Sequence, residues 1–445
     1  GQNMNMSYFK APVLAWKKVK RLLLLSFLVT TNNVFANDLT VDSVSLSEAI
    51  QRTLANNPQL TAFKYKQKRL DGELATAGLK PEYNVSAELE NFAGTGDVSG
   101  FSDAELTLSI SSVVELGDKV NSRKLYVNAQ QQAIAVEKRI QTLDILGEVA
   151  ARYIDVLTLQ QIMLVNENAE KLARETYQTV SKKVRVGSAP SSEQKRADAA
   201  LATARLKTLT ISKQLEASVR KLAIMWGEQS PQFSRVSGDL FALPKTISLE
   251  YIMAQLSQSP HILAYAEQSR IQQAQLQSIN AQSHANITWS AGVKRLEGSN
   301  ETALVAGISV PLFTSDRNRG SYQSQKAKLD EVEQQRKASE RAIYSQLATF
   351  YAAQEEARLT VETLQTSIIP PQESALSLVQ KAYSDGRFSY LELVSVQKEL
   401  IEMQYALIFA ASEVHKQSAS IESLSGIPLI SSGNTESQLS SFIEN

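Results

Sequence analysis

The residue types that carry most enzyme and metal chemistry are sparse in this 445-residue sequence. It contains no cysteine, which excludes disulfides, thiolate metal ligands and catalytic thiols. Its three histidines, His261, His284 and His415, do not have the spacing of residues that share one metal ion. We therefore expect no fixed metal site, no cofactor and no cofactor-binding residues.

Motifs for catalysis and for nucleic-acid binding are missing as well. We find no nucleophile elbow, zinc-protease helix or Walker sequence, so we expect no catalytic residues and no enzyme activity. Gly94, Gly96 and Gly100 superficially resemble a phosphate-binding loop, but they connect two predicted strands and do not lead into a helix. Lysine and arginine together number 46, as do aspartate and glutamate, and this balance leaves no basic footprint for nucleic acid.

The acidic residues that stand out belong to a sequence repeat. Gly187 and Glu193 recur as Gly386 and Glu392, about two hundred residues later and with the same spacing. Other segments recur at similar offsets and in the same order, 46–60 as 249–262 and 108–110 as 308–310. A duplication that includes both helical and alternating segments indicates a repeated architecture.

The repeat divides the chain into five parts. We expect a signal peptide at 1–36, a first structural repeat at 37–227, an inter-repeat linker at 228–246, a second repeat at 247–425 and a polar tail at 426–445. A basic stretch at 17–21, an apolar run at 22–29 and the small residue Ala36 are typical of a secretory signal peptide. A membrane anchor is the alternative, but the apolar run is far shorter than the roughly 20 residues that span a bilayer.

Long helical segments make up most of each repeat. Residues 120–186 contain no proline and one glycine, which predicts a single helix of about 100 Å. Gly187 and Gly386 fit the left-handed position that ends a helix, and this predicts two helix-tip turns. Pro370 and Pro371 should kink or split the long helix of the second repeat. Other helices are predicted at 46–79, 191–226, 249–283, 319–384 and 390–424.

Four shorter segments alternate apolar and polar residues, as strands do. They form one hairpin in each repeat, 85–90 with 106–111 and 287–293 with 302–312. Segments of this length can cross an outer membrane, although a soluble hairpin is just as short. The apolar faces that would contact outer-membrane lipid are formed by Leu106, Leu108, Ile110, Leu304, Ile308 and Val310.

Four strands are too few to close a transmembrane barrel, since the smallest have about eight. An open sheet edge in lipid would leave backbone donors unpaired. Three chains would supply twelve strands and leave room for an aqueous lumen. We therefore expect a homotrimer with a mainly α fold and a small β part, in which the long helices form an α-helical barrel continuous with the membrane strands.

Several segments carry a family resemblance. Residues 46–58, 307–313 and 382–386, together with the order of the repeated segments, resemble the TolC family of outer-membrane efflux factors over nearly the whole mature chain. The resemblance implies a trimer with a twelve-stranded barrel in the outer membrane. It also implies a helical tunnel in the periplasm that is closed at its inner end and docks to a periplasmic adaptor.

A narrower resemblance concerns the first hairpin. Residues 88–96, 104–109 and 115–119 are similar to the CzcC-type branch of the family. Members of that branch work with resistance-nodulation-division (RND) pumps of the inner membrane that expel divalent cations such as cobalt, zinc and cadmium. The resemblance therefore implies a passive exit duct of a tripartite system for heavy-metal cations.

The family resemblance also implies a gate near the two tip turns. In the family, an acidic residue six positions beyond each tip glycine lines the entrance, which places Glu193 and Glu392 there, and a tyrosine matched by Tyr383 holds the closed state. Rings of carboxylates at a constriction would attract cations. The expected gate residues are Glu193, Glu392, Tyr383, Asp385, Arg185 and Arg387. The plainer alternative is that they are solvated residues at helix ends.

Two other functions remain open from the sequence. The same fold could serve multidrug efflux or type I protein secretion. A periplasmic coiled-coil structural protein would belong to a different class, but residues 329–369 keep no strict 3.5-residue repeat and the alternating hairpins have no place in it.

Overall fold

The structure is a computed structural model, and it describes residues 43–428. The predicted signal peptide and all but the start of the predicted polar tail lie outside the described residues. No described helix combines the length and the apolar composition that crossing a membrane requires.

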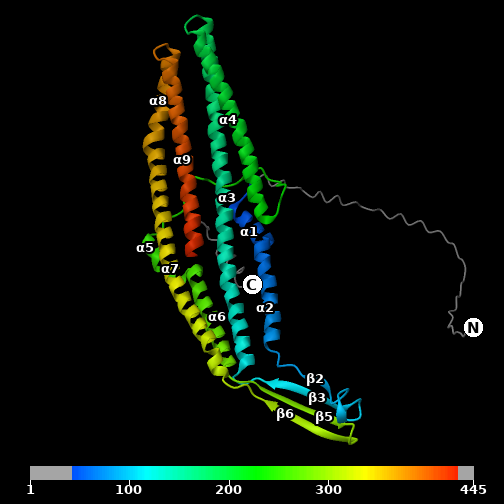
Figure 1. Cartoon of the computed structure of the whole chain (residues 1–445). Coiled ribbons are helices and arrows are strands. Elements are labelled where there is room, and N and C mark those ends of the chain that lie inside the picture. The colour runs from blue at the N-terminus through cyan, green and yellow to red at the C-terminus, as the bar shows by residue number, and fades with distance from the viewer. Residues whose placement is uncertain (1–42, 429–445) are drawn as a thin grey trace, which may run out of the picture. The chain divides into compact units, whose positions relative to one another are not determined.

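Long helices dominate the described residues (Figure 1). The longest, α3, has 67 residues and is therefore about 100 Å long at 1.5 Å per residue. The helices are α1 (Leu46–Asn56), α2 (Pro58–Ala77), α3 (Lys119–Arg185), α4 (Ser191–Ala223), α5 (Leu249–Ala254), α6 (Pro260–Gln282), α7 (Thr314–Thr363), α8 (Ile369–Ser384) and α9 (Tyr390–Ser425). The prediction of a mainly α fold is confirmed.

Prolines divide two segments that the sequence pattern presents as single helices. The segment predicted at 46–79 is two helices, because Pro58 disfavours helical backbone at Asn57. The side chain of Asn57 instead caps α2 by accepting a hydrogen bond from the Gln59 N–H at 2.9 Å. Pro260 has the same effect in the second repeat, where α5 and a short 3₁₀ turn precede α6.

The interruption predicted at Pro370 and Pro371 takes the form of a π-helical turn. This turn, η4 (Leu364–Ile368), lies between α7 and α8, and the prolines are the second and third residues of α8. A proline cannot donate the hydrogen bond that continues an α-helix, and a π-turn in front of it accommodates the loss.

The four predicted strands form one antiparallel sheet at the end of the helices opposite the two tips (Figure 1). The strands are β2 (Asn84–Glu90), β3 (Glu105–Val114), β5 (Ile287–Leu296) and β6 (Glu301–Ser309), in the order β2-β3-β5-β6. The hairpins of the two repeats therefore join through β3 and β5, and β2 and β6 are the edges. Val310 was predicted to be in the last strand but lies one residue beyond it, because Pro311 has no N–H to continue the ladder.

The register separates an apolar face from a polar face. Leu108 pairs with Val293, which pairs with Leu304, and the neighbouring row on the same face contains Ile110. On the other face, Ser109 pairs with Ser86, and their hydroxyl oxygens lie 2.7 Å apart. The alternation of apolar and polar residues in the sequence therefore gives the sheet one apolar face and one polar face.

The helices pack around a core that also holds the inter-repeat segment. Buried residues of α3, α4 and α9 surround Leu240, and the backbone carbonyl of Leu240 lies 2.9 Å from Nε2 of His415. Two short strands, β1 (Ser43–Val44) and β4 (Arg235–Val236), pair in parallel and attach the start of the described chain to this segment. His415 is therefore part of the packing of the inter-repeat segment.

Candidate gate at the helix tips

The turn between α3 and α4 is built around Gly187. This glycine has a φ of +74°, which a residue with a side chain rarely adopts. The Ser188 N–H donates to the Lys183 carbonyl at 2.8 Å, and the Gly187 N–H donates to the Val184 carbonyl at 3.1 Å. These two bonds are the Schellman motif, and they fix the direction in which the last side chains of α3 leave the helix.

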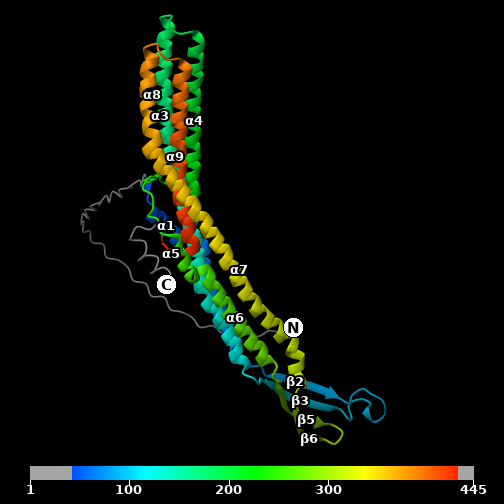
Figure 2. The same ribbon diagram turned by 90° about the vertical axis from the view of Figure 1, so that its left-hand side faces the viewer.

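The turn between α8 and α9 repeats the same motif. Gly386 has a φ of +78°, the Arg387 N–H donates to the Ala382 carbonyl at 2.8 Å, and the Gly386 N–H donates to the Tyr383 carbonyl at 3.1 Å. The ends of α3, α4, α8 and α9 lie together at one end of the described structure (Figure 2). Sequence duplication thus produces two matching tips.

A hydrogen bond links the two tips. The hydroxyl of Tyr383 in α8 donates to Oε2 of Glu193 in α4 at 3.2 Å. The Tyr383 side chain is buried, and Tyr390 packs against its ring edge-on, with ring centroids 6.4 Å apart. Burial, followed by the charge of the Glu193 carboxylate, raises the pKa of the Tyr383 phenol well above its ordinary value. The phenol therefore keeps its proton and remains a donor.

The equivalent glutamate of the second repeat is engaged differently. Glu392 forms a capping box with Ser389, whose backbone N–H and hydroxyl donate to its Oε2 at 2.8 and 2.9 Å. These bonds lower the pKa of the Glu392 carboxyl below its ordinary value. Glu392 is therefore held within its own turn, at the start of α9.

Two differences between the repeats explain this asymmetry. Ser389 is matched in the first repeat by Pro190, which has neither an N–H nor a hydroxyl to hold Glu193. Tyr383 is matched by Val184, which has no hydroxyl that could reach Glu392. Glu193 and Glu392 occupy equivalent positions in the sequence, but only Glu193 bonds to the other tip.

The remaining predicted gate residues do not join this contact. Arg387 forms an ion pair with Asp385 of its own turn at 2.8 Å, and both side chains are exposed. Arg185 is exposed, and no carboxylate among residues 43–428 forms an ion pair with it. The structure thus brings Tyr383 and Glu193 together and leaves the two arginines apart.

Sequence reasoning missed two side chains that touch Tyr383. The Lys183 ammonium lies 4.9 Å from the centre of the Tyr383 ring, and Tyr390 packs against the ring edge. The only available signal for Lys183 was its distance of four residues from Gly187, which places it in the last turn of α3. Tyr390 begins α9 and reads as an ordinary core residue.

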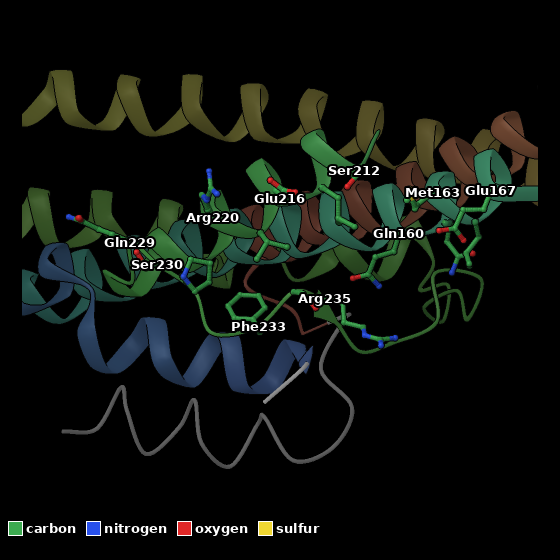
Figure 3. Close-up of a pocket in the computed structure, with 16 residues that line it drawn as sticks. Gln160, Met163, Glu167, Ser212, Glu216, Arg220, Gln229, Ser230, Phe233 and Arg235 are labelled. Atoms are coloured by element: carbon green, nitrogen blue, oxygen red, sulfur yellow. The ribbon is translucent and has the colours of Figure 1, made fainter. Parts of the chain in front are cut away.

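Away from the tips, a cleft of about 1010 Å³ lies between α3, α4 and the inter-repeat segment (Figure 3). Its lining mixes polar groups such as Gln160 and Arg220 with the ring of Phe233. Gln160 exchanges two hydrogen bonds with the backbone of Val236, at 2.7 and 3.0 Å, and so fixes β4 against α3. Within residues 43–428 no three His, Cys, Asp or Glu side chains are grouped so that they could hold a metal ion.

A family model described as "Outer membrane efflux protein" matches residues 49–228 and 253–427. The chain belongs to this family. Two relatives cover most of its length. The cobalt-zinc-cadmium resistance protein CzcC of Cupriavidus metallidurans is 23% identical over 388 residues, covering 86% of this chain and 90% of CzcC. The nickel-cobalt-cadmium resistance protein NccC of Alcaligenes xylosoxydans xylosoxydans is 22% identical over 330 residues, 72% of this chain and 73% of NccC.

Among solved structures, the CmeC outer membrane channel of Campylobacter jejuni has a similar fold. The TM-score is 0.71 at 15% identity, over 90% of this chain and 89% of CmeC. This outer membrane efflux protein therefore has the TolC-like fold that the sequence resemblance implied. It is a protein of the outer membrane, and its helical part lies in the periplasm.

Proposed function

We propose that this outer membrane efflux protein is the passive exit duct of a tripartite RND system that exports divalent heavy-metal cations. The observation that carries the proposal is the similarity to a cobalt-zinc-cadmium resistance protein over 86% of this chain and 90% of that relative. A duct of this kind has no catalytic step of its own and needs no fixed metal site, because it must release what passes through it.

A homotrimer is favoured by the sheet. Among residues 43–428, the edge strands β2 and β6 pair on one side only and leave their outer edges unpaired, and side chains on the apolar face are widely exposed, Leu304 at 86% and Ile308 at 78%. Three copies joined edge to edge would pair both strands and give twelve strands, enough to enclose water. The apolar face would then contact lipid.

The polar face favours cations as cargo. By the register of the four described strands, it carries four glutamates and one lysine, Glu88, Glu90, Glu105, Glu301 and Lys294. Lys294 bonds to Glu90 at 3.1 Å and also to Glu105. Each chain therefore contributes net negative charge to the face that would line the lumen, and such rings attract cations.

The Tyr383–Glu193 contact is suited to a closed gate. It joins the α3–α4 tip to the α8–α9 tip, at the end where a periplasmic adaptor would meet the duct. The contact involves side chains only, so it can break without disturbing either Schellman turn. We assign Glu193 and Tyr383 to the gate, and the adaptor and an inner-membrane RND pump as partners.

A deletion strain tests the cargo. We expect it to become sensitive to one or more of cobalt, zinc and cadmium, and to recover when the gene is restored on a plasmid. Sensitivity to hydrophobic drugs, with unchanged tolerance of all three metals, would assign the duct to multidrug efflux instead. Unchanged tolerance of both metals and drugs would contradict an efflux role altogether.

A further inference from the structure

The side chain of Lys183 crosses from the first tip to the second. Lys183 lies in the last turn of α3, where the Ser188 N–H and hydroxyl both donate to its carbonyl, at 2.8 and 3.1 Å. The turn therefore holds its backbone, and its partly buried side chain extends toward α8. Its ammonium lies 4.9 Å from the centre of the Tyr383 ring, within the range of a cation–π contact.

The second tip leaves space for this ammonium. A Cβ atom placed on Gly386 would lie 3.9 Å from Nζ of Lys183, so the ammonium sits between the tyrosine ring and the α8–α9 turn. No carboxylate among residues 43–428 forms an ion pair with Lys183. The ring of Tyr383 is therefore the group that attracts the ammonium.

Tyr383 is thus held on three sides. Glu193 of α4 accepts from its hydroxyl, Tyr390 of α9 packs against its edge, and Lys183 of α3 lies over its ring. Two of these contacts come from the opposite tip. The position in the second repeat that matches Lys183 is Ala382, so the arrangement has no reciprocal copy.

We propose that Lys183 is a positioning residue of the gate, which holds the Tyr383 ring so that its hydroxyl stays on Glu193. This rests on the gate assigned above. Opening then breaks the Tyr383–Glu193 hydrogen bond and the Lys183–Tyr383 cation–π contact together. Lys183 therefore influences the gate through the Tyr383 ring, without contacting the Glu193 carboxylate. Arginine, which also forms cation–π contacts, can replace Lys183 in this role.

Single-channel recordings of the mature full-length protein in planar bilayers test the proposal. We expect Lys183→Met to raise the ratio of open to closed time by about 3- to 30-fold, the range that a cation–π contact supports. Lys183→Arg should stay near wild type. Lys182→Met is the matched control, because it removes the same charge from the neighbouring, exposed lysine.

The Tyr383→Leu background separates positioning from general destabilisation of the tip. Without the aromatic ring, Lys183→Met should add no further opening. An equal effect of Lys183→Met with and without the ring would overturn the proposal, as would no effect in the wild-type background. Tyr383→Phe tests the gate itself. If this variant does not open the channel, both the gate and the role of Lys183 fail, whereas opening by Tyr383→Phe but not by Lys183→Met rejects Lys183 alone.

Discussion

At the scale of residues, the link between the tips depends on two positions at which the two repeats differ, one in each repeat. Pro190 in place of a serine frees Glu193 from a capping box, and Tyr383 in place of a valine supplies the donor that reaches it. The family resemblance predicted that both residues lie near one entrance. It did not predict their pairing, although Pro190 and Ser389 are visible in the alignment of the repeats and predict different helix starts.

The pKa of Tyr383 gives this link a definite response to alkali. A phenol whose pKa is raised in the folded state favours the folded contact below the ordinary value of 10.0, and the contribution is lost as pH rises through the folded value. Between pH 7 and the ordinary tyrosine pKa, Tyr383 stays protonated, and we expect no change in channel opening from its ionisation. Opening should increase only at higher pH. Bilayer recordings across this range measure the effect, and Tyr383→Phe should remove the alkaline step. An alkaline step centred below the ordinary value would contradict the buried, protonated phenol.

At the scale of elements, the alternation of apolar residues predicted the strands and their two faces. It could not predict that the two hairpins adjoin through β3 and β5, because the paired residues are nearly two hundred positions apart in the chain. The breaks at Asn57 and Ser259 were missed because the helical pattern continues across them. Both precede a proline, and at both positions the backbone leaves the helical region.

The junction between sheet and helices depends on close packing at Gly117. This residue has a φ of +78°, and a Cβ atom on it would lie 2.5 Å from the His284 ring. Lys119 secures the same junction by donating to the His284 carbonyl at 2.7 Å. Gly117→Ala should therefore destabilise the protein by about 2 kcal/mol or more, through backbone strain and the steric clash.

The loss can be measured as a lower temperature at which the oligomer dissociates during electrophoresis. Gly72→Ala is the control, because nothing lies within 4 Å of a Cβ atom there, and it removes a glycine from the interior of α2. This variant should be neutral or slightly stabilising. Equal stability of the two variants would show that the contact with His284 is not tight.

At the scale of the whole molecule, the sequence predicted the fold class and the family because the repeat, the strand lengths and the tip turns all agree. The proposed cargo rests on similarity to a metal-resistance protein and not on a binding site that a motif could reveal. In the proposed trimer, selectivity for cations would come from the charges on the polar face of the sheet. The four glutamates and one lysine on the polar face matter as a ring, so single-chain reasoning understates them.

The most direct test of the account is the reversal potential of the purified oligomer in a bilayer that separates two concentrations of cobalt chloride. A homotrimeric duct lined by the polar face of the sheet should give a single conducting species, and its reversal potential should have the sign expected of a cation-selective pore. Glu88→Gln should move the reversal potential toward zero, because each chain then loses one lumenal carboxylate. An anion-selective potential, or the absence of any conducting oligomer even for the gate-opening variant Tyr383→Phe, would contradict the proposal that this protein is an exit duct for divalent cations.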